Sequence, residues 1–222
     1  MPIKIKSLLN TLLLVCLIVV PSITFAKPKP VPGVMAMFNN FNELEEGFRS
    51  GEWDKATATV SKIEADYKNL VQDLKGTIDG KIIQKFGFLI GSFKKHLESK
   101  DSETVEKPFL NLQSMFIDIM DHYDYPSPPV LIIVARYIDE ANEALEKNDL
   151  GDAGEELEEI GGFKDRVVKA FTEKGLSKTN IDEFFEMVEQ GEGIAEKNDQ
   201  AGMKALLDKL HVVVAPSAQD ND

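Results

Sequence analysis

The chain has 222 residues, of which 38 are acidic and 25 are basic, so its formal net charge at neutral pH is −13. This charge argues against binding to nucleic acids or anionic membrane surfaces, because both are themselves negative. It is compatible with a cation or a basic protein as partner. A solvated acidic surface that keeps the protein soluble is the simpler interpretation.

Residues 1–26 have the pattern of a secretory signal peptide. Lys4 and Lys6 precede an uncharged run from Leu8 to Val20, and Thr24-Phe25-Ala26 is a small-x-small cleavage site. The apolar run is shorter than the roughly 20 residues of a membrane-spanning helix, although an uncleaved anchor is the alternative. Cleavage would leave 23 basic and 38 acidic residues, a charge of −15. We therefore expect an exported, periplasmic protein without stable membrane insertion after cleavage.

Apolar residues beyond the signal peptide recur at steps of three and four, which is the spacing of one face of a helix. No window alternates with period two over the length of a strand, so the sequence predicts an all-α protein. Trp53, the only tryptophan, starts the most regular stripe, and we expect it to be largely buried. The clearest stripes are Trp53, Ala56, Val60, Ile63, Tyr67, Leu70 and Leu74, and Ile83, Phe86, Ile90, Phe93 and Leu97.

A helical hairpin is repeated four times with a period of about 48 residues. Its apolar anchors are 49, 48 and 49 residues apart, at Phe48, Leu97, Leu145 and Ile194. A turn follows each anchor, where Gly or Asn tolerates the left-handed conformation and Asp or Asn can cap the next helix. We expect eight helices in antiparallel pairs. The turns are at Gly51, Lys100-Asp101, Asn148-Asp149 and Asn198-Asp199.

The links between hairpins predict two units. Residues 75–80 and 173–177 are short connectors with glycine, whereas residues 123–129 contain three prolines and are stiffer. Phe48 to Leu145 and Leu97 to Ile194 are both 97 residues apart, as duplication of a four-helix unit requires. A tetratricopeptide array is the rival architecture, but its period is about 34 residues. We therefore predict a lead-in, two duplicated four-helix bundles and a disordered tail, at residues 27–33, 34–126, 127–215 and 216–222.

The segment Phe48-Arg-Ser-Gly51-Glu-Trp53-Asp-Lys-Ala56 has the pattern hydrophobic-x-x-Gly-x-Trp-x-x-Ala. In this pattern the chain resembles the helical hairpins of periplasmic segments attached to bacterial iron permeases. Its plan also resembles cytochromes of the four-helix class, which attach haem through Cys-x-x-Cys-His near the end of the last helix. The comparable segment here, Asp118-Ile-Met-Asp121-His122, has no cysteine, and Cys16 lies in the signal peptide. Covalent haem is therefore excluded, and no cofactor is predicted.

Two acidic segments are candidates for metal binding. Asp118 and His122 share a helix face with Asp121 nearby, so a carboxylate and an imidazole could hold one divalent ion. Their face is opposite the apolar stripe, and a solvated face is the simpler interpretation. The segment Glu155-Glu156-Leu157-Glu158-Glu159 contains two Glu-x-x-Glu pairs, an arrangement seen in ferric-iron sites. Acids early in a helix also interact favourably with the helix dipole, which explains this segment more simply.

The sequence gives no support for enzymatic chemistry. It contains no Gly-x-Ser-x-Gly, no phosphate-binding glycine loop and no zinc-hydrolase spacing of histidines. It also has no Glu-x-x-His pair of the kind used by carboxylate-metal bundle enzymes. The sequence therefore favours a non-enzymatic, exported helical binding or accessory module of the bacterial periplasm. The alternative is a periplasmic cation- or metal-binding protein that uses acidic and histidine side chains.

Overall fold

The computed structural model describes residues 26–215, and within this range the chain is all-α and has no strand. The predicted tail, and the signal peptide except for its last residue, lie outside the described residues. No helix within residues 26–215 is both long and apolar enough to cross a membrane. The helices are α2 (Pro32–Arg49), α3 (Trp53–Leu74), α4 (Gly80–His96), α5 (Ser102–Met120), α6 (Pro129–Glu146), α7 (Leu150–Gly161), α8 (Lys164–Glu173), α9 (Lys178–Glu196) and α10 (Gln200–Val214).

The four predicted turns each contain a residue with a left-handed backbone. The φ angles are 75° at Gly51, 50° at Lys100, 61° at Asn148 and 52° at Asn198. Glycine and asparagine adopt this conformation at little cost, whereas Lys100 carries a modest strain. These turns end one helix and allow the next to run antiparallel to it.

Side-chain caps start several of the helices. The carboxylate of Asp79 accepts a hydrogen bond from the Lys81 amide at 2.8 Å, and that of Asp199 accepts one from Gly202 at 2.9 Å. Asp149 caps α7 in the same way. Helices α2 and α6 begin with a proline, whose missing N–H would have no partner in a first turn. Each cap satisfies an amide that the helix itself leaves free.

Two hydrophobic clusters form the core, and we call the helices around them the first unit (α2 to α5) and the second unit (α6 to α10). The first cluster draws on residues 34–123 and is rich in phenylalanine, with Phe41 and Phe116 stacked at 4.9 Å between ring centroids. The second draws on residues 130–214 and also includes Ile117 of α5. The change from one cluster to the other falls at the proline-rich link.

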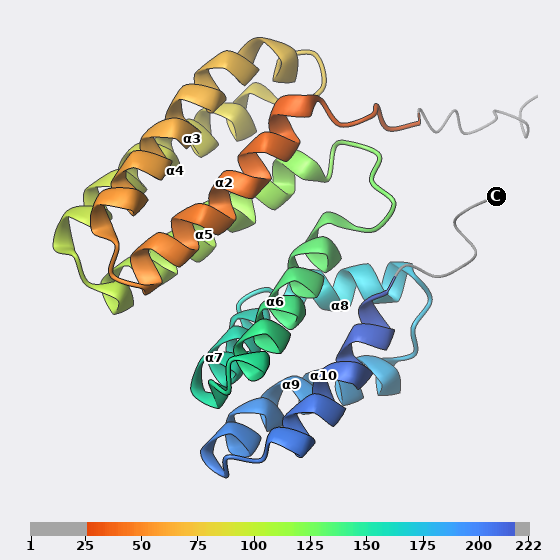
Figure 1. Ribbon diagram of the computed structural model, residues 1–222. Coiled ribbons are helices and arrows are strands. Elements are labelled where there is room, and N and C mark those ends of the chain that lie inside the picture. The colour runs from red at the N-terminus through yellow and green to blue at the C-terminus, as the bar shows by residue number, and fades with distance from the viewer. Residues whose placement is uncertain (1–25, 216–222) are drawn as a thin grey trace, which may run out of the picture.

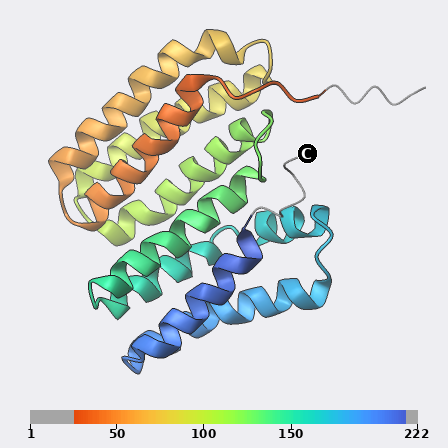
Figure 2. The same ribbon diagram turned by 45° about the vertical axis from the view of Figure 1, so that its right-hand side comes forward.

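Each unit closes as a ring of helices. In the first unit α2 packs on α3, α3 on α4, α4 on α5, and α5 on α2. In the second unit the ring consists of α6, α7, α9 and α10, and α8 contacts α6 and α9. Figures 1 and 2 show the two units one above the other, with α5 and α6 adjacent where the units meet. This junction carries the charged side chains described below.

The expectation of eight helices is wrong within the described range, because the helix expected after Leu150 is broken into α7 and α8. The break lies at Gly162-Phe163, directly after Gly161, and glycine disfavours helix interiors. A Cβ on Gly162 would lie 3.2 Å from Leu110 Cδ1 of α5. The absence of a side chain at Gly162 therefore also leaves room for Leu110 of the first unit.

One smaller expectation is corrected, and the burial of Trp53 is found to be incomplete. Helix α2 begins at Pro32, inside the segment 27–33 that was expected to be extended, because a proline fits the first helical position. Trp53 is only partly buried at the start of α3, packed against the edge of the first cluster. Leu150, its predicted equivalent, is 4% exposed. The first turn of a helix at the end of a bundle leaves the large ring of Trp53 partly in solvent.

Candidate functional site

The junction between the units contains a network of buried charged side chains centred on Arg49 at the end of α2. Its guanidinium binds Glu156 Oε1 of α7 through Nη1 at 3.0 Å and Glu159 Oε1 through Nη2. Nη2 also lies 3.3 Å from Glu45 Oε1 of its own helix. Arg49 therefore joins the first unit to two carboxylates of the second.

A second arginine makes the reciprocal connection. Arg136 of α6 donates from Nη2 to Glu45 Oε2 at 2.8 Å, and from Nη1 to Glu140 on its own helix. The hydroxyl of Tyr137 lies 3.1 Å from Glu45 Oε1 and 3.2 Å from Gln113 Oε1 of α5. Glu45 is only 3% exposed, so these contacts replace the water that a carboxylate needs.

Carboxylates outnumber guanidinium groups in the buried part of the network. Glu45, Glu156 and Glu159 are all less than 10% exposed, whereas Arg49 and Arg136 are the only basic side chains of residues 26–215 that pair with them. Burial raises the pKa of Glu156 to about 8, although Arg49 beside it lowers that pKa in part. Burial also raises the pKa of Glu159 to about 9, and Arg49 again lowers that pKa in part. Burial therefore favours the protonated form of both carboxyl groups, whereas Arg49 favours their charged form.

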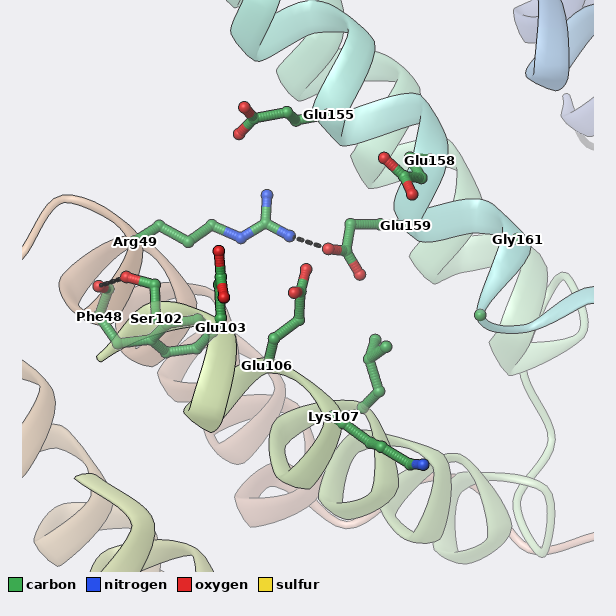
Figure 3. A pocket seen from close by; sticks show the side chains of 12 residues that line it. Phe48, Arg49, Ser102, Glu103, Glu106, Lys107, Glu155, Glu158, Glu159 and Gly161 are labelled. Atoms are coloured by element: carbon green, nitrogen blue, oxygen red, sulfur yellow. Dashed lines mark hydrogen bonds and ion pairs between the residues drawn. The ribbon is translucent and has the colours of Figure 1, made fainter. Parts of the chain in front are cut away.

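Two clefts open on either side of Arg49, and Figure 3 shows the first of them. The first cleft has a volume of about 800 Å³ and lies between α5 and α7. The second has a volume of about 480 Å³ and lies between α2, α6 and α7. The charged residues of the first are Arg49, Glu103, Glu106, Lys107, Glu155, Glu158 and Glu159. Those of the second are Glu43, Glu45, Glu46, Arg49, Arg136, Glu140, Glu143, Lys147, Asp152, Glu155 and Glu156.

One carboxylate oxygen in this region has no partner. Glu156 Oε2 is buried and accepts no hydrogen bond from any residue of 26–215, while Oε1 of the same group binds Arg49. A buried acceptor without a donor costs free energy. The wall of the second cleft therefore holds an unused acceptor for a positively charged group.

The metal candidates Asp118, Asp121 and His122 lie together at the end of α5, but they do not form a shared site. Asp118 Oδ1 accepts a hydrogen bond from Arg166 Nη2 of α8 at 2.7 Å, and Asp121 Oδ2 lies 4.0 Å from Arg166 Nη1. His122 Nδ1 lies 2.8 Å from the Asp118 carbonyl oxygen. No three acidic, histidine or cysteine side chains of residues 26–215 are grouped so that they could hold a metal ion. The idea of a solvated face is also wrong for Asp118, which is paired with the second unit.

The acids of the segment Glu155 to Glu159 divide between the buried junction and the clefts. Glu156 and Glu159 face Arg49, whereas Glu155 and Glu158 are exposed in the clefts. The sequence analysis missed Arg49, Glu45 and Arg136 as site residues. A signal existed for Arg136, because it follows six apolar residues in α6, where a charge needs a buried partner.

Comparison of the chain with protein-family models, with curated proteins and with solved structures gave no match. The resemblances to iron-permease segments and to four-helix cytochromes therefore stay predictions. The fold and the junction define an all-α helical bundle protein with an acidic, arginine-bridged junction between two units.

Proposed function

We propose that this chain is an exported, non-enzymatic binding protein of the bacterial periplasm that receives a positively charged partner at the clefts beside Arg49. The observation that carries the proposal is the excess of acid in both clefts, five acidic against two basic residues in the first and eight against three in the second. Clefts of one sign concentrate the field and attract an oppositely charged partner. The signal peptide predicted for residues 1–26 supports the periplasmic location.

The shape of the clefts favours a partner with several separated charges. The exposed carboxylates Glu103 and Glu158 approach the first cleft from different helices, and Glu43 and Glu143 do the same in the second. A basic protein segment could place one side chain against each of them. A protein partner is therefore the better supported ligand, and a small cation is the alternative.

A capped hexa-arginine peptide tests this function. We expect calorimetry at low ionic strength to detect binding that weakens as salt is added, because exposed charges are screened. Hexaglutamate serves as the control and should not bind. Absence of hexa-arginine binding, or equal binding after Glu103→Gln, Glu106→Gln and Glu158→Gln are combined, would contradict the proposal.

The metal-binding alternative has weaker support, because Arg166 already provides the positive charge beside Asp118. If Asp118, Asp121 and His122 did bind a divalent ion, saturation at 100 times its dissociation constant would add about 2.7 kcal/mol to the free energy of unfolding. We expect no such increment in the wild type. A metal-dependent rise in melting temperature that His122→Ala abolishes would reverse the ranking of the two functions.

We also infer that the two units are copies of one four-helix ancestor. The 97-residue offset and the same ring order of helices support this inference, with α8 as an addition in the second copy. An experimental structure should superpose α6, α7, α9 and α10 on α2 to α5 in that order, with Leu145 on Phe48. A different order would contradict duplication.

A further inference from the structure

The wall of the second cleft contains a buried carboxylate of which only one oxygen is used. Glu156 of α7 lines this cleft and is 9% exposed. Its Oε1 accepts a hydrogen bond from Arg49 Nη1 at 3.0 Å, whereas its Oε2 is buried and has no donor among residues 26–215. A buried carboxylate oxygen without a donor costs free energy. A donor that enters the cleft would therefore gain a hydrogen bond in addition to the attraction between opposite charges.

The other two carboxylates of this cleft that are not exposed have both oxygens in use. Glu45 Oε1 lies 3.1 Å from the Tyr137 hydroxyl, and its Oε2 accepts from Arg136 at 2.8 Å. Both oxygens of Glu140 accept from Arg136 Nη1, at 2.9 and 2.7 Å. Among these three groups of the described chain, Glu156 alone retains an oxygen for a ligand.

The rim of the second cleft attracts positive charge of any kind. Glu143, Asp152 and Glu155 are exposed and line the cleft, and Lys147 is the exposed basic residue among its lining residues. Exposed carboxylates bind guanidinium and ammonium groups alike, and salt screens both. The rim therefore contributes to affinity, and a preference between the two kinds of cation has to come from the wall.

The geometry at Glu156 favours an ammonium group over a guanidinium group. A guanidinium binds a carboxylate best through two parallel N–H bonds, which use both carboxylate oxygens. Arg49 already occupies one oxygen of Glu156. An ammonium group is a compact charge that can direct one N–H at the other oxygen. The last torsion of a glutamate side chain is soft, so this oxygen can turn toward the cleft at little cost.

We propose that Glu156 Oε2 binds a primary ammonium group in the second cleft, supplied by a lysine side chain of the basic partner. This proposal rests on the proposed function, since it names the side chain that the partner places in this cleft. Arg49 keeps its contact with Oε1, so the carboxylate lies between one cation of the chain and one of the partner. The wall thus selects lysine, although the rim binds arginine as well.

Three capped hexapeptides of equal charge test this preference: hexa-lysine, hexa-arginine and hexa-trimethyllysine, which keeps its charge but has no side-chain N–H to donate. Calorimetry with the full mature chain at pH 9 measures their dissociation constants. Burial raises the pKa of Glu156 to about 8, so at pH 9 this group is charged, and the lysine ammonium is charged as well. We expect hexa-lysine to bind about tenfold more tightly than either other peptide, as one hydrogen bond to a charged group allows.

Glu156→Gln removes the acceptor and keeps the size of the side chain. The amide oxygen can still bind Arg49, which leaves an N–H donor in the place of Oε2. We expect the preference for hexa-lysine to disappear in this variant. Glu155→Gln is the matched control, because it removes one exposed charge from the same helix and cleft. It should weaken hexa-lysine and hexa-arginine by the same factor and leave the preference unchanged.

The comparison of hexa-lysine with hexa-trimethyllysine uses the wild type, so it decides the proposal even if Glu156→Gln does not fold. Equal binding of hexa-lysine and either other peptide, or a preference that persists in Glu156→Gln, would overturn the ammonium site and leave the proposed function intact. Spermidine distinguishes a free polyamine from a protein segment, and tighter binding of spermidine than of hexa-lysine would overturn the assignment to lysine. Binding of neither hexa-lysine nor hexa-arginine would overturn the proposed function together with this proposal.

Discussion

At the scale of single residues, Glu156 and Glu159 are the most perturbed acids of the junction. Their burial raises the pKa of the first to about 8 and of the second to about 9. Each is paired with Arg49. Burial favours the protonated form of each carboxyl group, whereas Arg49 favours the charged form.

This arrangement predicts how stability depends on pH. An unfolded glutamate has a pKa of 4.5, so between about pH 4.5 and 9 the folded chain binds more protons than the unfolded chain. The free energy of unfolding should therefore fall as the pH rises through this window. We expect the melting temperature at pH 9 to lie at least about 2–4 °C below that at pH 6, which corresponds to about 1 kcal/mol in a chain of this size.

Thermal unfolding followed by circular dichroism measures this effect. Combining Glu156→Gln with Glu159→Gln should flatten the dependence, because neither position can then lose a proton. Glu158→Gln should keep the wild-type slope. An unchanged slope in the double variant would show that other groups cause it.

At the scale of elements, α7 and α9 approach each other closely through small residues. A Cβ on Gly191 of α9 would lie 2.5 Å from Leu157 Cδ1, and one on Gly154 of α7 would lie 3.1 Å from Ala195 Cβ. Leu157 is fully buried in the second cluster and has little room to move. Glycine at position 191 therefore sets the spacing of these two helices.

Two glycines of α9 offer a matched test of that close contact. Gly191→Ala should lower the free energy of unfolding by about 1–3 kcal/mol, because the methyl group overpacks the contact with Leu157. Gly193→Ala should raise it by about 0.5–1 kcal/mol, since a Cβ there meets nothing within 4 Å and alanine favours the helix. Urea titration of both variants measures the difference. Equal effects at the two positions would contradict the packing argument.

At the scale of the whole molecule, the two units meet through charges as well as apolar contacts. Glu45 to Arg136, Arg49 to Glu156 and Asp118 to Arg166 each connect one unit with the other. Phe38 packs against both hydrophobic clusters, and Leu110 packs against the second from α5. Of these three pairs, Glu45–Arg136 should be the most sensitive to loss of one partner, because the Glu45 carboxylate has little access to water.

Removing one arginine at a time should show that a buried ion pair contributes more to the free energy of unfolding than an exposed one. Arg136→Met should lower the free energy of unfolding by about 3–5 kcal/mol, because Glu45 loses its 2.8 Å partner while it stays buried. Arg166→Met should cost less than about 1 kcal/mol, because its side chain and that of Asp118 are each about one third exposed. Urea unfolding measures both. A loss of less than about 1 kcal/mol for Arg136→Met would contradict the argument from burial.

The sequence by itself determined the all-α class and the places where the chain turns. Both are local properties: the stripe with steps of three and four requires a helix, and Gly51, Asn148 and Asn198 allow the left-handed residue that ends one. The glycine pair at 161–162 was also visible in the sequence, although its effect on the helix after Leu150 was not anticipated. Trp53 is less buried than the later residues of its stripe, because a regular stripe does not say how far its first residue lies from the end of the bundle.

Only the tertiary structure decided which charges meet. Arg49 and Glu159 are 110 residues apart, and Glu45 and Arg136 are 91 apart. Helical periodicity gives the face of each helix but not the neighbour that covers it. The sequence therefore favoured favourable helix-dipole contacts for the acids of α7, with an iron-type pattern as the alternative, and did not predict their pairing with Arg49. The packing of α2 and α5 against α6 and α7 buried some of these acids and left others in the clefts. The raised pKa values of Glu156 and Glu159 follow from that burial, and no local pattern of residues could have predicted them.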